Sequence, residues 1–135
     1  MDDETYAYFF IEGFLCKPDD ISKAIKLKPT EYRIKGEISK LGFPIKQNCW
    51  ILYSTCQKNE QFLDNHIKSL LDILLSRKKF ILKMTEKYEC GINCVGVYVS
   101  PNHGIHLSKE IIKGLSRLNI ELDFDLYCNA IMSSQ

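Results

Sequence analysis

The apolar spacing of residues 61–75 constrains the fold of this chain more than any other feature. Large apolar side chains recur there at intervals of three and four residues, which is the pattern of a helix with one buried face. They are Phe62, Leu63, Ile67, Leu70, Leu71 and Leu74. A buried helix face needs an apolar surface to pack against, and the segments before and after this helix resemble strands. We therefore expect helices packed on a sheet.

Two segments at opposite ends of the chain carry the clearest strand signals. Residues 6–14 (YAYFFIEGF) are rich in aromatic side chains, and residues 120–127 alternate strictly between apolar and polar side chains. This alternation predicts that Ile120, Leu122, Phe124 and Leu126 face the core. Further strands are predicted at 32–34, 49–55 and 90–100, with a hairpin from 90–100 to a short strand at 105–107.

Other helices are marked by their end residues. Pro18, followed by two aspartates, is typical of a first helical turn, and Pro29 would stop that helix. The helix at 61–75 is expected to break near Ser76, with a second helix beside it. Ser108 is suited to begin the last helix and Asn119 to end it.

This order of elements predicts an α+β two-layer sandwich with a mixed or antiparallel sheet of about six strands and three to four helices. The first part has the strand, helix, strand, strand, helix, strand order of a ferredoxin-like unit. The 135 residues are enough for a single domain spanning 1–135, with an ordered core at about 6–128 and short flexible termini.

Charge and hydropathy limit the partners. Lys and Arg number 18 and Asp and Glu number 17, so the formal charge of +1 gives no global attraction to nucleic acid or to anionic membranes. No window approaches the roughly 18 apolar residues of a spanning helix, and the first four residues are acidic where a signal peptide is basic. We expect a cytoplasmic protein that binds neither nucleic acid nor membrane.

Six cysteines and three histidines are the candidate metal ligands. Without an export signal, the cysteines are interpreted as reduced thiols. Cys90 and Cys94 form one close pair, whereas structural zinc sites commonly bring two such pairs. His103 and His106 flank a turn and need not point the same way. No metal and no cofactor is predicted, although these two pairs stay open as metal-binding alternatives.

Polar residues of the last strand are the first binding-surface candidates. Asp123 and Asp125 share one strand face, and Glu121 and Tyr127 extend it into an acidic row. This row is either a charged, solvated sheet face or a recognition surface for a basic partner.

Two further candidates lie elsewhere in the chain. Trp50, the sole tryptophan, is either a core anchor, which is favoured, or an exposed binding residue. His66 borders the apolar stripe of its helix, where a structural hydrogen-bonding role is favoured.

Scattered residues along most of the chain also match a known pattern. They are the aromatic strand ending at Gly13, Pro18 with Ile21, Pro29-Thr30, Lys35-Gly36, Trp50, His66 and the closing segment 122–127. In these residues the chain resembles the DUF4279 family of small, mostly bacterial proteins of unknown function. The resemblance implies a fold, and it transfers no catalytic role to His66, Trp50 or Asp125.

The sequence carries no common catalytic motif, and this bears on the choice between function classes. Phosphate-binding loops, dinucleotide fingerprints, nucleophile elbows and zinc-protease motifs are absent from the sequence, which favours a non-catalytic role. The main hypothesis is an immunity-type protein that neutralises a cognate bacterial toxin by direct binding. One alternative is a small-ligand binder or enzyme with a sheet-helix pocket around His66, Asp123 and Asp125. Another is a homodimeric structural module that pairs the aromatic first strand or the strand at 105–107.

Overall fold

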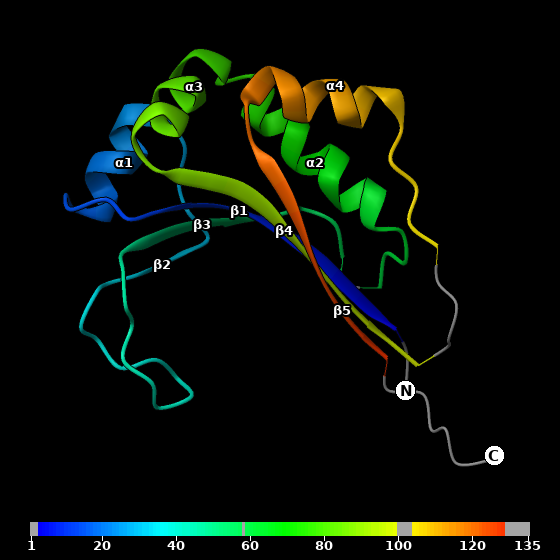
Figure 1. The fold of residues 1–135 in the computed structure, drawn as a ribbon, viewed down its shortest axis with the longest axis horizontal. Helices are drawn as coiled ribbons and strands as arrows, with labels where there is room; N and C mark the ends of the chain where they lie inside the picture. The colour runs from blue at the N-terminus through cyan, green and yellow to red at the C-terminus, as the bar shows by residue number, and fades with distance from the viewer. Residues whose placement is uncertain (1–2, 58, 100–103, 129–135) are drawn as a thin grey trace.

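The computed structural model describes residues 3–57, 59–99 and 104–128. Within these ranges one five-stranded sheet carries four helices, all on the same face (Figure 1). The strands are β1 (Glu4–Glu12), β2 (Glu31–Arg33), β3 (Cys49–Tyr53), β4 (Glu89–Tyr98) and β5 (Glu121–Cys128). The helices are α1 (Pro18–Ile25), α2 (Leu63–Leu75), α3 (Lys78–Lys87) and α4 (Lys109–Leu118). The predicted α+β sandwich is confirmed.

Strand order also confirms the ferredoxin-like arrangement of the first part. The sheet runs β2-β3-β1-β4-β5, and β3 is antiparallel to both β1 and β2. Strands β1 and β2 are therefore parallel with β3 inserted between them, which is the split βαβ unit. Strand β5 pairs parallel to β4 at one edge of the sheet, and α4 makes the crossover between them.

The predicted hairpin after β4 is wrong. Residues 104–108 form no strand, and His103 lies outside the described residues. Because β5 runs parallel to β4, the chain must return along the length of the sheet before β5 begins. The segment 104–108 belongs to that return, which leads to Ser108, where the serine hydroxyl caps α4 by accepting the Ile111 N–H at 3.3 Å.

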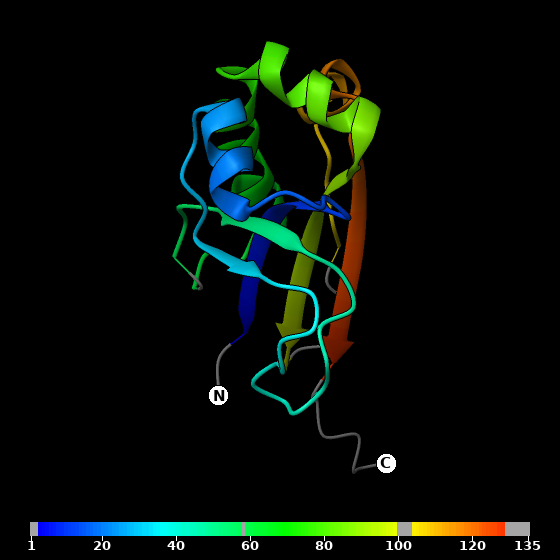
Figure 2. The ribbon, with the colours of Figure 1, turned by 90° about the vertical axis from the view of Figure 1, so that its left-hand side faces the viewer.

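Alternation along β1 divides the sheet into two faces. Thr5, Ala7, Phe9 and Ile11 are buried beneath the helices, whereas the residues between them are partly exposed on the other side. Figure 2 shows the helices on one side of the sheet only. We call the uncovered side, which displays Tyr6, Tyr8, Phe10 and Glu12 of β1 and their cross-strand partners, the open face.

The predicted core face of β5 is only half correct. Ile120 is buried and Leu122 packs against the core, but Phe124 is 37% exposed and Leu126 is 47% exposed. The second half of β5 extends away from the helices at the edge of the sheet (Figure 1). Alternation in sequence shows which side chains share a face, but not how far the covering helices reach.

The helices themselves are short. Helix α2, which covers the centre of the sheet, has 13 residues. No helix among the described residues has the length and apolar character needed to cross a membrane.

Candidate functional site

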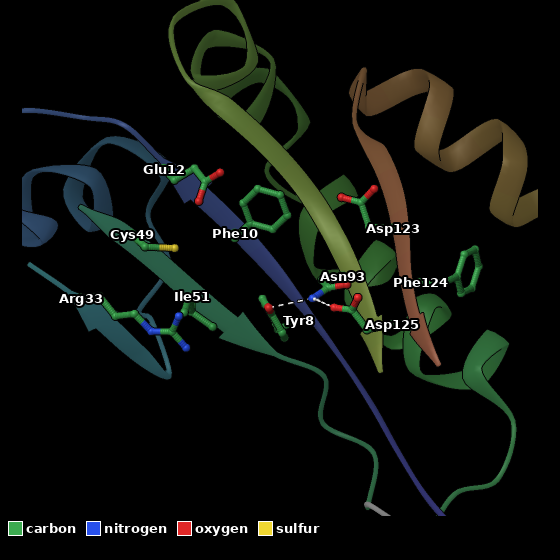
Figure 3. A pocket seen from close by; sticks show the side chains of 10 residues that line it. All are labelled: Tyr8, Phe10, Glu12, Arg33, Cys49, Ile51, Asn93, Asp123, Phe124 and Asp125. Carbon is green, nitrogen blue, oxygen red and sulfur yellow. Dashed lines mark hydrogen bonds between the residues drawn. The ribbon is translucent and has the colours of Figure 1, made fainter. Parts of the chain in front are cut away.

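A groove of about 380 Å³ lies on the open face, above the middle of the sheet (Figure 3). All five strands contribute side chains to it. The residues that line it are Tyr8, Phe10, Glu12, Arg33, Cys49, Ile51, Asn93, Asp123, Phe124 and Asp125.

Strand register brings these residues together from distant parts of the sequence. Tyr8 of β1 is opposite Asn93 of β4, which is in turn opposite Asp123 of β5. The neighbouring row places Phe10 opposite Ile51 on one side and Gly91 on the other. The groove is thus a set of cross-strand rows that exists only once the sheet has formed.

Aromatic rings form the floor of the open face. The Tyr8 ring centroid lies 5.3 Å from that of Tyr53 and 6.5 Å from that of Phe10, and the Tyr6 centroid lies 5.9 Å from that of Tyr53. A methyl group at Gly91 would lie 3.1 Å from Phe10 Cζ, so the absence of a side chain there lets the Phe10 ring lie against β4.

Asn93 occupies the centre of the β5 half of the groove. Its amide nitrogen donates to the Tyr8 hydroxyl at 2.8 Å and to the Asp125 carboxylate at 3.1 Å (Figure 3). Its Oδ1 is buried and has no hydrogen-bond partner among the described residues. Buried acceptors are nearly always paired in native proteins, so this oxygen marks a point where a donor from outside the chain would be favourable.

At the β2 half of the groove are two neighbouring carboxyl groups, Glu12 and Glu89, and one cation, Arg33. Glu12 is opposite Glu89 across β1 and β4, and the two side chains share a hydrogen bond. Burial and the adjacent Glu89 carboxyl raise the pKa of Glu12, while the Arg33 guanidinium partly opposes that increase. Arg33 thus partly balances the negative charge at this end.

Cys49 is the thiol in the groove. Burial, and secondly the Glu12 carboxylate, raise its pKa to about 12. At neutral pH it is a protonated thiol, which is a poor nucleophile and a poor metal ligand.

A second hollow of about 510 Å³ adjoins the groove, and Arg33 lines both. It lies beside the segment between β2 and β3, whose apolar side chains are turned to solvent. Ile38, Leu41 and Phe43 are 66%, 83% and 69% exposed. The aromatic and acidic groove therefore continues into an exposed apolar surface.

The predicted acidic row lies on the open face. Asp123 and Asp125 line the groove, and Glu121 and Tyr127 extend the row along β5 in both directions, opposite Gly91 and Val97. All four side chains are exposed. Their shared face follows from the period of two along a strand.

Trp50 and His66 do not lie on any surface, which corrects their choice as binding candidates. Both are fully buried on the helix-covered side of the sheet. The Trp50 indole N–H donates to Ser22 Oγ at 3.0 Å, and this satisfies the polar atom of a core anchor.

His66 joins β1, the end of β3 and α2 in a buried network. Its Nδ1 lies 2.6 Å from Ser54 Oγ, and its Nε2 lies 3.1 Å from Thr5 Oγ1 and 3.3 Å from the Glu60 carbonyl oxygen. Because a carbonyl oxygen only accepts, Nε2 carries the proton and Nδ1 accepts from the Ser54 hydroxyl. Burial lowers the pKa of His66, which keeps the ring neutral. The expected structural hydrogen bonding is confirmed.

The sheet separates His66 from Asp123 and Asp125. The histidine is on α2 and is buried on the helix-covered side of the sheet, whereas the two aspartates lie on the open face. The predicted single pocket around all three residues is therefore wrong. That prediction placed the three polar side chains on one side of the sheet, whereas the sheet lies between the histidine and the two aspartates.

The candidate metal ligands are dispersed. No group of three His, Cys, Asp or Glu side chains suited to a metal is found among the described residues. Cys90 and Cys94 share the helix-covered face of β4, where burial raises the pKa of each thiol to about 12.

The groove residues of β1, β2 and β4 were missed by sequence reasoning. Asn93 and Arg33 carry no local motif, and their importance depends on strand order. The alternation of Tyr6, Tyr8, Phe10 and Glu12 within the first strand was the available signal, because it shows that aromatic and acidic side chains share one face.

Comparison with known proteins and families identifies the family of this chain. No curated protein and no solved structure matches the chain. The model of a family described as a domain of unknown function (DUF4279) matches residues 3–129, which is nearly the whole chain. This protein therefore belongs to the DUF4279 family.

Proposed function

We propose that this protein is a non-catalytic binding protein that holds the basic surface of a partner protein on its open face. The observation that carries the proposal is the groove itself, in which aromatic rings form the floor and Asp123, Asp125 and Glu12 supply carboxylates. Aromatic faces and carboxylates both attract cationic groups.

The distribution of charge supports a local recognition surface. The chain as a whole has a formal charge of only +1. Helix α3, on the far side of the sheet, carries four lysines and a single glutamate, whereas the groove is lined by three carboxylates and one arginine. This separation orients an approaching basic partner toward the open face.

A protein partner is favoured over a small ligand by the neighbouring apolar surface. Ile38 and Leu41 line the second hollow, which shares Arg33 with the groove, and Phe43 is exposed in the same segment; exposed apolar side chains beside a polar rim are typical of protein interfaces. A small cation bound in the groove would leave these apolar side chains exposed to solvent, whereas a protein partner can cover them.

The kind of partner we expect is a toxin, which an immunity-type protein in the cytoplasm would neutralise by covering a basic site. The near-neutral net charge fits a local acidic patch rather than mimicry of a whole nucleic acid. The homodimer alternative required a free edge at the aromatic first strand or at a strand at 105–107. Strand β1 is central in the sheet and residues 105–107 form no strand, so neither offers such an edge.

The test is a comparison of matched charge reversals in tagged full-length protein exposed to extracts of its native cell. Asp123→Lys with Asp125→Lys reverses the groove, and Asp72→Lys with Glu86→Lys makes the same change in charge on the exposed sides of α2 and α3. We expect one protein to be retained by the wild type and the control but lost from the groove variant. Equal retention by both variants, or no retained protein at all, contradicts the proposal.

If a partner is retained, its activity provides the second readout. An immunity-type role predicts that the partner is toxic when expressed alone and harmless when expressed with the wild-type chain. The groove variant should fail to protect while still folding, as judged by Trp50 fluorescence.

A further inference from the structure

The two ends of the groove differ in how their charges are balanced. At the β2 end, Arg33 faces Glu12. At the β5 end, Asp123 and Asp125 lie about 6.5 Å apart along the strand, as every second residue of a strand does. In the part of the chain that the structure describes, Asp125 accepts from the Asn93 amide, and neither aspartate pairs with a lysine or arginine.

Two aromatic rings, Tyr8 and Phe10, line the groove together with these two carboxylates, and the two ring planes are inclined at 62° to each other. Tyr8 is joined to Asn93 by a 2.8 Å hydrogen bond, and its ring packs beside Phe10. A cation that reaches Asp123 or Asp125 from the groove therefore passes over aromatic faces. Such faces attract cations, most strongly where water is partly excluded.

The third feature of this end is the unpaired acceptor. Asn93, which lies between Tyr8 of β1 and Asp123 of β5 in one cross-strand row, has a buried Oδ1 that accepts no hydrogen bond from any described residue. Once a neighbouring side chain moves to open this buried oxygen, a ligand with several N–H donors can bond a carboxylate and the amide oxygen together.

We infer that the β5 end of the groove binds the guanidinium group of an arginine side chain presented by the partner. This inference rests on the proposed function, and it names the group that anchors the partner. The planar guanidinium can stack on the Tyr8 ring while its forked N–H groups bond carboxylates in pairs, whereas an ammonium offers a compact charge with no flat face. Arginine is also enriched among the residues that dominate interface energetics.

Three blocked peptides that are identical except for a central arginine, lysine or citrulline test this inference. Citrulline keeps the shape of arginine but has no charge. The full-length protein is titrated with each peptide while the side-chain amide signals of Asn93 and the backbone signals of β4 and β5 are followed by NMR. We expect saturable shifts with the arginine peptide, about tenfold weaker binding of lysine, and no saturation with citrulline.

Variants of the two aspartates complete the test. Asp123→Asn with Asp125→Asn should weaken arginine binding by about tenfold or more, whereas Asp72→Asn with Glu86→Gln should leave it unchanged. Unchanged Trp50 fluorescence would show that both variants are folded. Equal binding of arginine and lysine, binding that survives the groove substitutions, or no saturable binding of the arginine peptide each overturns the inference.

Failure of the inference and failure of the proposed function remain distinguishable. If the arginine peptide does not bind, but a protein partner is still lost specifically on charge reversal at Asp123 and Asp125, only the arginine anchor is wrong. If neither depends on these residues, the open face is not the recognition surface.

Discussion

The side-chain amide of Asn93 on β4 lies 3.1 Å from the Asp125 carboxylate on β5 and donates a hydrogen bond to it. The same nitrogen reaches the Tyr8 hydroxyl on β1, so a single amide connects three neighbouring strands across the open face. This connection fixes the edge strand β5 to the centre of the sheet on the side that no helix covers. It also positions the carboxylate that we assign to partner binding.

Asn93→Asp should therefore weaken the fold at neutral pH. The change removes the amide donor to Tyr8 and Asp125, and it places a new carboxylate directly opposite Asp123. We expect a loss of about 1–3 kcal/mol in the free energy of unfolding, measured by urea denaturation with Trp50 fluorescence. Part of this loss should be recovered near pH 4, where protonation relieves the repulsion between carboxylates. A stability equal to that of the wild type at pH 7 would contradict the account of this amide.

Glu12 should make the protein less stable as pH rises. Burial and the Glu89 carboxyl raise the pKa of Glu12 above its ordinary value of 4.5, so the folded state holds this proton more tightly than the unfolded state does. The linked stability is present below about pH 4.5 and is lost as pH rises through the folded pKa. Glu12→Gln should raise the melting temperature at pH 7 and have little effect at pH 4.

A matched control for Glu12 is Glu86→Gln on the exposed side of α3, which should change the melting temperature at neither pH. If Glu12→Gln instead lowers the melting temperature at pH 7, attraction to Arg33 outweighs the burial of the carboxylate.

His66 should produce the opposite dependence. Burial lowers its pKa, so the unfolded state takes up a proton first as the pH falls. The stability due to the neutral ring is complete above about pH 6.5 and is lost as the pH falls through the folded pKa. In His66→Gln, urea denaturation at pH 7.5 and 5.5 should show lower stability at both values but a smaller difference between them.

Ser54→Ala tests the assignment of the His66 proton. It removes the hydroxyl that donates to Nδ1 and leaves a buried acceptor unpaired, which should cost about 1–3 kcal/mol. In the NMR spectrum, the Nε2 proton should persist in the variant. Its absence would mean that the ring holds its proton on Nδ1.

Ser108→Ala should weaken the start of α4. The serine hydroxyl accepts the Ile111 N–H, and loss of such a cap costs about 1 kcal/mol, or roughly 4 °C in melting temperature for a chain of this size. Ser116→Ala, on the exposed side of the same helix, is the control and should leave the melting temperature within about 1 °C. Equal losses in the two variants would show that the hydroxyl at 108 is not acting as a cap.

Most elements were predictable because their signals are local. The spacing of three and four residues in 61–75 defines α2, and Ser108 and Asn119 mark the two ends of α4. Asn119 adopts a left-handed conformation with φ of 56°, as a helix-ending asparagine can. The break between α2 and α3 at Ser76 was also predicted correctly.

The groove was only half predictable because its other half depends on strand order. Asp123 and Asp125 were found from alternation within one strand, which needs no knowledge of neighbours. Asn93 and Arg33 join the site only through strand pairing, because Asn93 lies opposite Tyr8, 85 residues away in sequence, and Arg33 lies opposite Cys49, 16 residues away. The exposure of Phe124 was missed for a similar reason, since local alternation does not show where the helix layer ends.

The central claim is that the open face recognises a basic partner, and calorimetry with a purified partner retained by the wild-type protein tests it most directly. Binding to the wild type is compared with binding to the groove variant Asp123→Lys with Asp125→Lys and to the control variant Asp72→Lys with Glu86→Lys. We predict that the groove variant loses at least about 100-fold in affinity, roughly 2.7 kcal/mol, that the control keeps wild-type affinity, and that wild-type binding weakens with salt. Equal affinity of all three proteins would contradict the account.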